Sequence, residues 1–104
     1  HQEREMVKLI AMYKEPADKE MFDAHYFEKH MPLVAKIPGL IKSEVSKVKV
    51  LPGTETNYYL MCEMYYEDMD AFNAGLASQK GKASARDLVN FAKNNVDFFI
   101  GKVK

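Results

Sequence analysis

The feature that most constrains the fold is a pair of strand-like segments, residues 6–14 and 57–67, whose apolar side chains fall on both faces. In the first segment, Val7, Leu9, Ala11 and Tyr13 would share one face, and Ile10 and Met12 the other. In the second, Tyr58, Leu60, Cys62, Met64 and Tyr66 would share one face, and Tyr59, Met61 and Tyr65 the other. An antiparallel sheet with helices on one face usually leaves a polar second face in water. Since burying a large apolar side chain contributes about 1.5–3 kcal/mol, this pattern predicts that both faces are covered.

A second copy of the chain is the most economical cover for the second face. Two such sheets packed face to face would form a homodimer with a barrel-like core, and a ligand cavity could lie in or beside that barrel. The alternative is that Tyr59 and Tyr65 are partly exposed strand residues, because tyrosine favours strands in any case.

The segments between these strands predict two helical units. Asp18 is a suitable N-cap for the first helix. A stripe at three- and four-residue spacing would face the sheet, formed by Met21, Phe22, His25, Tyr26, Lys29 and Leu33. Asp68 caps a second helix that carries Met69, Phe72 and Leu76. That helix is expected to break at Gly81 and to resume over residues 83–94.

The remaining segments complete an alternating order of strands and helices. Residues 41–50 form a strand whose apolar parity shifts between Val45 and Val48, which predicts a bulge or a sheet edge. Residues 52–54, Pro-Gly-Thr, form the turn into residues 57–67, and residues 96–103 form the last strand. The order β-α-β-β-α-β predicts an α+β, ferredoxin-like protomer with an antiparallel sheet. Together with the apolar second face of that sheet, this order predicts a dimeric α/β barrel.

Residues 25–33, His-Tyr-Phe-Glu-Lys-His-Met-Pro-Leu, depart from ordinary helix packing. Pro32 lacks an N–H and clashes one turn back, so the helix should kink or break between Glu28 and Met31. His30 beside that kink could face a cavity and serve as an acid, a base or a hydrogen-bond donor. The alternative is a structural histidine that binds the Glu28 carbonyl freed by Pro32. His25 lies five residues earlier, about 140° around a regular helix, so the two imidazoles are badly placed to share a metal ion unless the kink reorients them.

Composition limits the classes of partner and the cell compartment. The 15 basic residues are scattered among 15 acidic ones, so nucleic acid is not an expected partner. No apolar run is long enough to span a membrane, and the single cysteine, Cys62, fits a reducing cytoplasm. Neither a metal nor another cofactor is expected. Residues 1–5 are interpreted as a tag remnant or short extension, and residues 6–104 as one domain.

Three stretches resemble the EthD family of dimeric α+β barrel proteins, named for ethyl tert-butyl ether degradation. They are MVKLIAMYK, FDAHYFEKHMPLVAKIPGL and ASQKGKASARDLVNF. The resemblance implies an EthD-like domain over residues 6–104, a ferredoxin-like protomer, a homodimer, and a pocket between sheet and helices near His30. It further implies a small-molecule-binding protein for a hydrophobic or aromatic metabolite, in a catabolic or oxidative pathway. Lys80 stands where the family pattern has an acid, so a carboxylate role at that position is not expected.

Several aromatic residues could line such a pocket and bind a flat or bulky apolar ligand. The candidate substrate-binding residues are Tyr13, His25, Tyr26, Phe27, Tyr59 and Tyr65, with His30 as the candidate catalytic residue. Each ring could instead belong to the core. The alternative function is a cofactor-free enzyme, polyketide-cyclase-like or monooxygenase-like, in which His30 is the general acid or base. Asp87 is interpreted as a helix-surface residue or a link to a loop, and Cys62 as an inert buried thiol.

Overall fold

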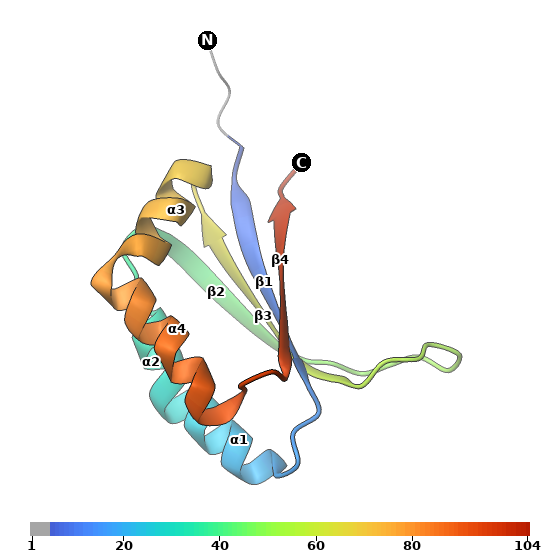
Figure 1. Ribbon diagram of the computed structural model, residues 1–104. Helices are drawn as coiled ribbons and strands as arrows, with labels where there is room; N and C mark the ends of the chain where they lie inside the picture. Colours follow the sequence, from blue (N-terminus) through green and yellow to red (C-terminus); the bar gives the residue numbers. More distant parts are fainter. Residues whose placement is uncertain (1–4) are drawn as a thin grey trace.

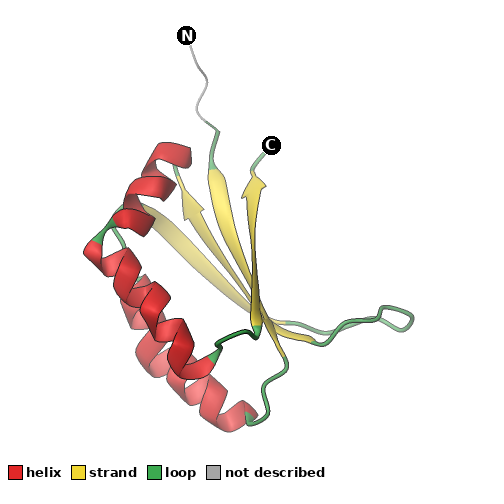
Figure 2. Ribbon diagram, in the orientation of Figure 1, coloured by secondary structure: helices red, strands yellow, loops and turns green. Residues whose placement is uncertain are grey.

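The computed structural model describes residues 5–104 and contains one antiparallel sheet with the strand order β2-β3-β1-β4 (Figure 1). The strands are β1 (Val7–Lys14), β2 (Leu40–Lys47), β3 (Tyr58–Tyr66) and β4 (Val96–Lys102). The helices are α1 (Lys19–His25), the π-helical turn η1 (Tyr26–His30), α2 (Met31–Val34), α3 (Met69–Ala77) and α4 (Gln79–Phe91). All of these helices lie over one face of the sheet (Figure 2). The predicted α+β, ferredoxin-like protomer is therefore confirmed.

Alternation along β1 separates the two faces of the sheet as predicted. Val7, Ala11 and Tyr13 are buried beneath the helices. Ile10 and Met12 lie on the opposite face, which we call the open face, and are half-buried. Because β1 lies between β3 and β4 in the sheet, its buried side chains lie at the centre of the core.

A β-bulge at the start of β3 reverses the expected orientation of two tyrosines. Tyr13 pairs with Leu60, but the next residue of β1, Lys14, pairs with Tyr58, so Tyr59 has no partner in β1. The Tyr59 ring consequently packs edge-on against Phe22 on the helix side, with ring centroids 5.7 Å apart. Strict alternation had assigned Tyr59 to the other face. That assignment is wrong because one extra residue in a strand inverts the faces beyond it.

The first helical unit is continuous from Lys19 to Val34. The helix therefore does not break between Glu28 and Met31, and the irregularity predicted there takes the form of a π turn. The chain widens instead, and the Met31 N–H donates to the Tyr26 carbonyl five residues back. This π turn lies directly before Pro32, where a regular helix would press the proline ring against the Glu28 carbonyl. The helix therefore continues through Pro32, although Pro32 has no N–H to donate to the Glu28 carbonyl.

The π turn also explains which side chains of this helical unit are buried. The buried positions follow a four-residue interval: Phe22, Tyr26, His30 and Val34. In a regular α-helix, side chains four residues apart differ in direction by about 40°, so a series at this interval would gradually turn away from the sheet. The widened turn offsets that drift. The predicted stripe is therefore wrong at Met21 and Lys29, both of which are exposed.

The second helical unit breaks at Ser78 rather than at Gly81. The Ser78 side chain accepts a hydrogen bond from the Gly81 N–H at 3.0 Å and so caps α4. Gly81 lies inside the first turn of α4, where a Cβ would come within 2.1 Å of the Gly75 carbonyl oxygen. Glycine at position 81 thus permits close packing of α3 and α4 instead of ending a helix.

The strand β2 lies at the sheet edge, as its irregular alternation predicted. Its register shift falls between Leu40 and Lys42, not between Val45 and Val48. At the chain ends, Glu5 forms an ion pair with Lys104, and the rest of the expected extension lies outside the described residues. Among the described residues, no helix combines the length and apolar character that crossing a membrane requires.

Candidate functional site

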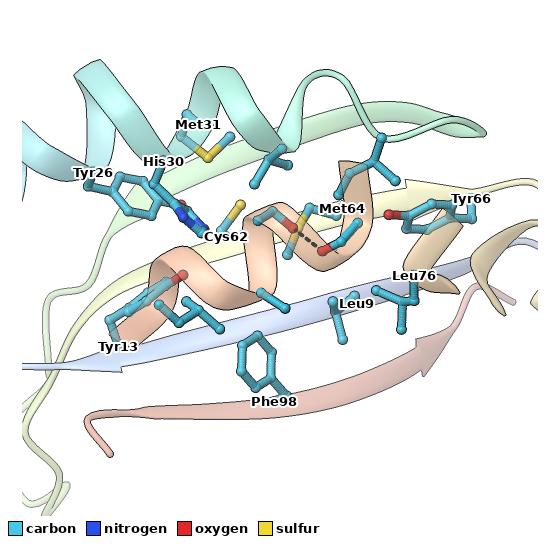
Figure 3. Close-up of a pocket in the computed structure, with 16 residues that line it drawn as sticks. Leu9, Tyr13, Tyr26, His30, Met31, Cys62, Met64, Tyr66, Leu76 and Phe98 are labelled. Atoms are coloured by element: carbon cyan, nitrogen blue, oxygen red, sulfur yellow. Dashed lines mark hydrogen bonds between the residues drawn. The ribbon is translucent and has the colours of Figure 1, made fainter. Parts of the chain in front are cut away.

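A cavity of about 290 Å³ lies between the sheet and the helices (Figure 3). Its polar and aromatic lining residues are Tyr13, Tyr26, His30, Cys62, Tyr66, Ser84 and Phe98. Its aliphatic and small lining residues are Leu9, Met31, Val34, Ile37, Met64, Leu76, Gly81, Ala85 and Leu88. Within the described part of the chain, no Lys, Arg, Asp or Glu lines this cavity.

One carboxylate, that of Asp87, holds two imidazoles at the edge of the cavity. His30 Nδ1 lies 2.9 Å from Asp87 Oδ2, and His25 Nε2 lies 3.0 Å from both carboxylate oxygens. Asn90 Nδ2 donates to Asp87 Oδ1 at 2.9 Å. His30 and Asp87 are both buried, with 5% and 8% of their surface exposed. This cluster joins the first helical unit to α4.

The hydrogen bonds decide the protonation of this cluster. Burial opposes the ionisation of Asp87, but hydrogen bonds from Asn90, His25 and His30 outweigh it and lower the pKa of the carboxyl. An ionised carboxylate only accepts hydrogen bonds, so both imidazoles donate to it. The proton of neutral His30 therefore sits on Nδ1, and Nε2 is left as an acceptor on the cavity side.

Burial lowers the pKa of His30 below its ordinary value, although the hydrogen bond and charge of Asp87 oppose the change. His30 is therefore neutral at pH 7, with the Nε2 lone pair available. A neutral imidazole held by a buried carboxylate is the arrangement of a general base, because the carboxylate stabilises the imidazolium that forms when a proton is taken up.

The π turn brings the two histidines to the same carboxylate. In a regular helix, positions 25 and 30 would point about 140° apart, and the divergence expected from that spacing is removed because the π turn reorients the two side chains. Phe91, one turn after Asp87 on α4, packs against both imidazoles with ring centroids 5.0 Å from His25 and 4.8 Å from His30. No group of three or more His, Cys, Asp or Glu within residues 5–104 is arranged to hold a metal ion.

Asp87 is the functional candidate that sequence reasoning missed, since it is neither a surface residue nor a loop link. A signal was present in the sequence. Asp87 lies next to Leu88 and four residues before Phe91, on the apolar stripe of a helix. A carboxylate in that position requires buried hydrogen-bond donors, and an imidazole N–H is such a donor, so the histidines were candidates for its partners.

The structure brings together only some of the residues nominated from the sequence. Tyr13, Tyr26 and His30 line the cavity, whereas His25 reaches Asp87 from outside it. Phe27 is 48% exposed on the outer side of the helix. The remaining two tyrosines also lie outside the cavity.

Those two tyrosines bind surface carboxylates. The Tyr59 hydroxyl contacts Asp23 at 3.0 Å and accepts from Lys47 at 2.8 Å. The Tyr65 hydroxyl donates to Glu44 at 3.2 Å. Both hydroxyls are therefore engaged near the surface, away from the cavity lining.

Two other tyrosine hydroxyls, those of Tyr26 and Tyr66, are buried without an oxygen or nitrogen partner among the described residues. The Tyr26 hydroxyl interacts only with the Cys62 thiol, a weak acceptor. Burial raises the pKa of both phenols, so both keep their protons. Burying a hydroxyl in this way costs about 1–3 kcal/mol. Burial also raises the pKa of the Cys62 thiol, which keeps it protonated and makes it a poor nucleophile.

Comparison with known proteins identifies a family for this fold and site. The EthD domain matches residues 14–95. The uncharacterized 11.0 kDa protein in the thcB-thcC intergenic region of Rhodococcus erythropolis is 34% identical over 91 residues, which cover 88% of each chain.

Two solved structures show similar folds. An ethyl tert-butyl ether degradation (EthD) family protein from Bacillus halodurans C-125 is 44% identical, with a TM-score of 0.89 over 95% of this chain and 99% of that one. A dimeric protein of unknown function and ferredoxin-like fold from Bacteroides fragilis is 22% identical, with a TM-score of 0.66 over 94% and 96% of the two chains.

Proposed function

The chain belongs to the EthD family, and we propose that this member binds a small, predominantly hydrophobic or aromatic molecule in the cavity beside His30. The observation that carries the proposal is the cavity of about 290 Å³ itself. Its lining is mostly apolar and includes a few polar groups, which is the usual composition of a small-molecule site.

The test uses a neutral fluorescent probe and a variant that obstructs the cavity. Ala85 lines the cavity from α4 and is itself exposed, so it lies at the open side of the cavity, and Ala85→Phe should obstruct that side. Ala74, exposed on α3 and absent from the lining, provides the matched control Ala74→Phe. N-Phenyl-1-naphthylamine should bind the parent protein and the control equally and bind Ala85→Phe about tenfold more weakly or worse. Equal binding to all three proteins would place the probe elsewhere and contradict the proposal.

A second candidate function, cofactor-free acid–base catalysis, is favoured by the 2.9 Å contact between His30 Nδ1 and Asp87. In this reaction class, His30 Nε2 removes a proton from a carbon next to a ligand carbonyl, leaving an enolate. The resulting imidazolium is stabilised by Asp87 and returns the proton to the product. General-base catalysis of this kind contributes about 10²–10⁴-fold in rate.

Deuterium exchange into 2-tetralone in D₂O, followed by NMR, tests this candidate. The protein should accelerate exchange, and His30→Gln should remove about 100-fold or more of the acceleration. Tyr65→Phe removes a hydroxyl that binds Glu44 outside the cavity, so this control variant should retain the activity. Exchange that is equally fast with and without His30 would refute the catalytic role.

We further propose that the protein forms a homodimer through the open face of the sheet. Ile10, Met12 and Met61 are only half-buried there, and Phe99 of β4 is 51% exposed. The Bacteroides fragilis protein of similar fold is described as dimeric. A second sheet would remove this apolar surface from water.

Analytical ultracentrifugation of a charge variant tests the dimer. Phe99→Glu should shift the protein to monomer at micromolar concentration, because it buries a carboxylate in the proposed contact. Val89→Glu makes a comparable change at a 61% exposed position on α4 and should leave the dimer intact. A monomeric parent protein would end the proposal.

A further inference from the structure

Two hydroxyls without an oxygen or nitrogen partner indicate what kind of ligand the cavity takes. Tyr26 and Tyr66 are fully buried and line the cavity. Among the described residues, the Tyr66 hydroxyl has no hydrogen-bond partner, and the Tyr26 hydroxyl has only the Cys62 thiol, whose sulfur is a weak acceptor. The other tyrosines of β3 differ, since Tyr58, Tyr59 and Tyr65 each bond to a carboxylate. Both poorly partnered hydroxyls therefore belong to the cavity lining.

The two rings lie toward opposite ends of the cavity. Figure 3 shows Tyr26 beside His30 at one end and Tyr66 at the other, with Cys62 and Met64 between them. The Cys62 thiol acts electrostatically on both phenols and is a weak hydrogen-bond partner of Tyr26, which agrees with this intermediate position. A molecule that fills the cavity would meet one hydroxyl near each end.

Both rings are held firmly by their surroundings. Tyr26 packs between Tyr13 and Phe22, with ring centroids 5.4 and 5.7 Å away. Tyr66 meets Phe72 edge-on at 5.4 Å, and a Cβ added to Gly75 would lie 3.2 Å from the Tyr66 ring. With the rings fixed, neither hydroxyl can turn to a distant protein acceptor.

The charge distribution narrows the ligand class. Cationic side chains are absent from the cavity lining within residues 5–104. The Asp87 carboxylate lies directly behind His30. An anionic ligand would lose its hydration without gaining a counter-charge and would be repelled by Asp87.

We propose that the ligand is a neutral, largely apolar molecule with a hydrogen-bond-accepting oxygen toward each end, one bound by the Tyr26 hydroxyl and the other by the Tyr66 hydroxyl. The inference rests on the proposed binding function and names the chemical class of its ligand. The hydroxyls donate to carbonyl or ether oxygens, while the aliphatic lining covers the apolar body.

Three probes of one shape test this ligand class by fluorescence titration: 2,6-diacetylnaphthalene, 2,6-diethylnaphthalene and naphthalene-2,6-dicarboxylate. The diketone should bind about tenfold or more tightly than the hydrocarbon, and the dicarboxylate more weakly than either. Tyr26→Phe and Tyr66→Phe should each weaken diketone binding by about 3–10-fold and leave hydrocarbon binding unchanged. Tyr65→Phe removes a hydroxyl that lies outside the cavity and should change neither.

The outcomes separate this inference from the binding function. If hydrocarbon and diketone bind equally, or if both phenylalanine variants bind the diketone normally, the hydroxyls take water and the ligand class is wrong, although the binding function stands. Preferred binding of the dicarboxylate overturns the assignment of a neutral ligand. Failure of all three probes to bind overturns the binding function and the inference together. If one variant does not fold by circular dichroism, the other decides the result.

Discussion

Asp87→Asn is the most informative single substitution, because it keeps the size of the side chain and removes its charge. The carboxylate accepts hydrogen bonds from His25, His30 and Asn90 at 2.9–3.0 Å. Asparagine has one acceptor oxygen and an NH₂ group that only donates. At least one of the three donors must therefore lose its partner or change its own protonation.

The expected loss of stability follows from these contacts. Hydrogen bonds to a charged group contribute about 1.5–3 kcal/mol, against about 0.5–1.5 kcal/mol for neutral ones. Three hydrogen bonds that become neutral together lose about 3 kcal/mol of stability. Part of this loss is offset because the variant no longer has the desolvation cost of a buried charge. We expect a net loss of about 1–3 kcal/mol in urea unfolding, or a decrease in Tm of roughly 4–20 °C.

The chemical effect is read from the imidazoles by ¹⁵N–¹H correlation NMR, with the His30 signals assigned by their loss in His30→Gln. In the parent protein His30 should be protonated on Nδ1. In Asp87→Asn the amide NH₂ favours the opposite tautomer, with the proton on Nε2 and the base lost from the cavity. Because Asp87 opposes the lowering of the His30 pKa, the variant should lower that pKa further.

Asp97→Asn is the matched control, since the Asp97 carboxylate accepts from Tyr58 at 2.6 Å on the open face. It should cost at most about 1 kcal/mol and leave the spectrum of His30 unchanged. An Asp87→Asn variant in which the His30 tautomer persists, or in which its pKa rises, would refute the assignment of Asp87 as the group that orients His30.

Three further predictions concern stability. Tyr66→Phe removes an unsatisfied hydroxyl and should leave the free energy of unfolding in urea unchanged or raise it by up to about 1 kcal/mol, whereas Tyr58→Phe should lower it. A clear loss of stability in Tyr66→Phe would indicate an unrecognised partner of that hydroxyl. Gly81→Ala should destabilise the fold by about 2 kcal/mol or more, since its Cβ would lie 2.1 Å from the Gly75 carbonyl oxygen; a normal melting curve would contradict this packing. Because the His30 pKa is lowered from 6.5, the unfolded chain binds a proton where the native state does not, so urea stability should fall as the pH decreases from about 6.5. A fall of the same size in His30→Gln would assign it to other groups.

Elements with a strong local pattern were predictable from the sequence. The N-caps Asp18 and Asp68 both accept the hydrogen bonds expected of them. The alternation of β1 placed its two faces correctly. These features depend on a few neighbouring residues, so a single sequence contains the information.

The errors arose where one residue changes the geometry of a regular element. The bulge at Tyr59 and the π turn before Pro32 each contain one residue more than the ideal strand or helix. Such residues are tolerated because pairing or packing elsewhere compensates, and no local pattern reports that compensation. Asp87 was missed for a related reason: its two imidazole partners are 57 and 62 residues away in the chain.

The π turn between Tyr26 and His30 has a consequence for aligning this chain with its relatives. Its hydrogen bond spans five residues where an α turn spans four, so the segment corresponds to a regular helix with one residue inserted. A relative without the insertion would keep both imidazoles on one face only if they stood four positions apart. A correct alignment would then contain a one-residue gap within the helix. A search for the histidine pair at a fixed spacing of five would overlook such relatives, even where the paired imidazoles and their carboxylate are retained.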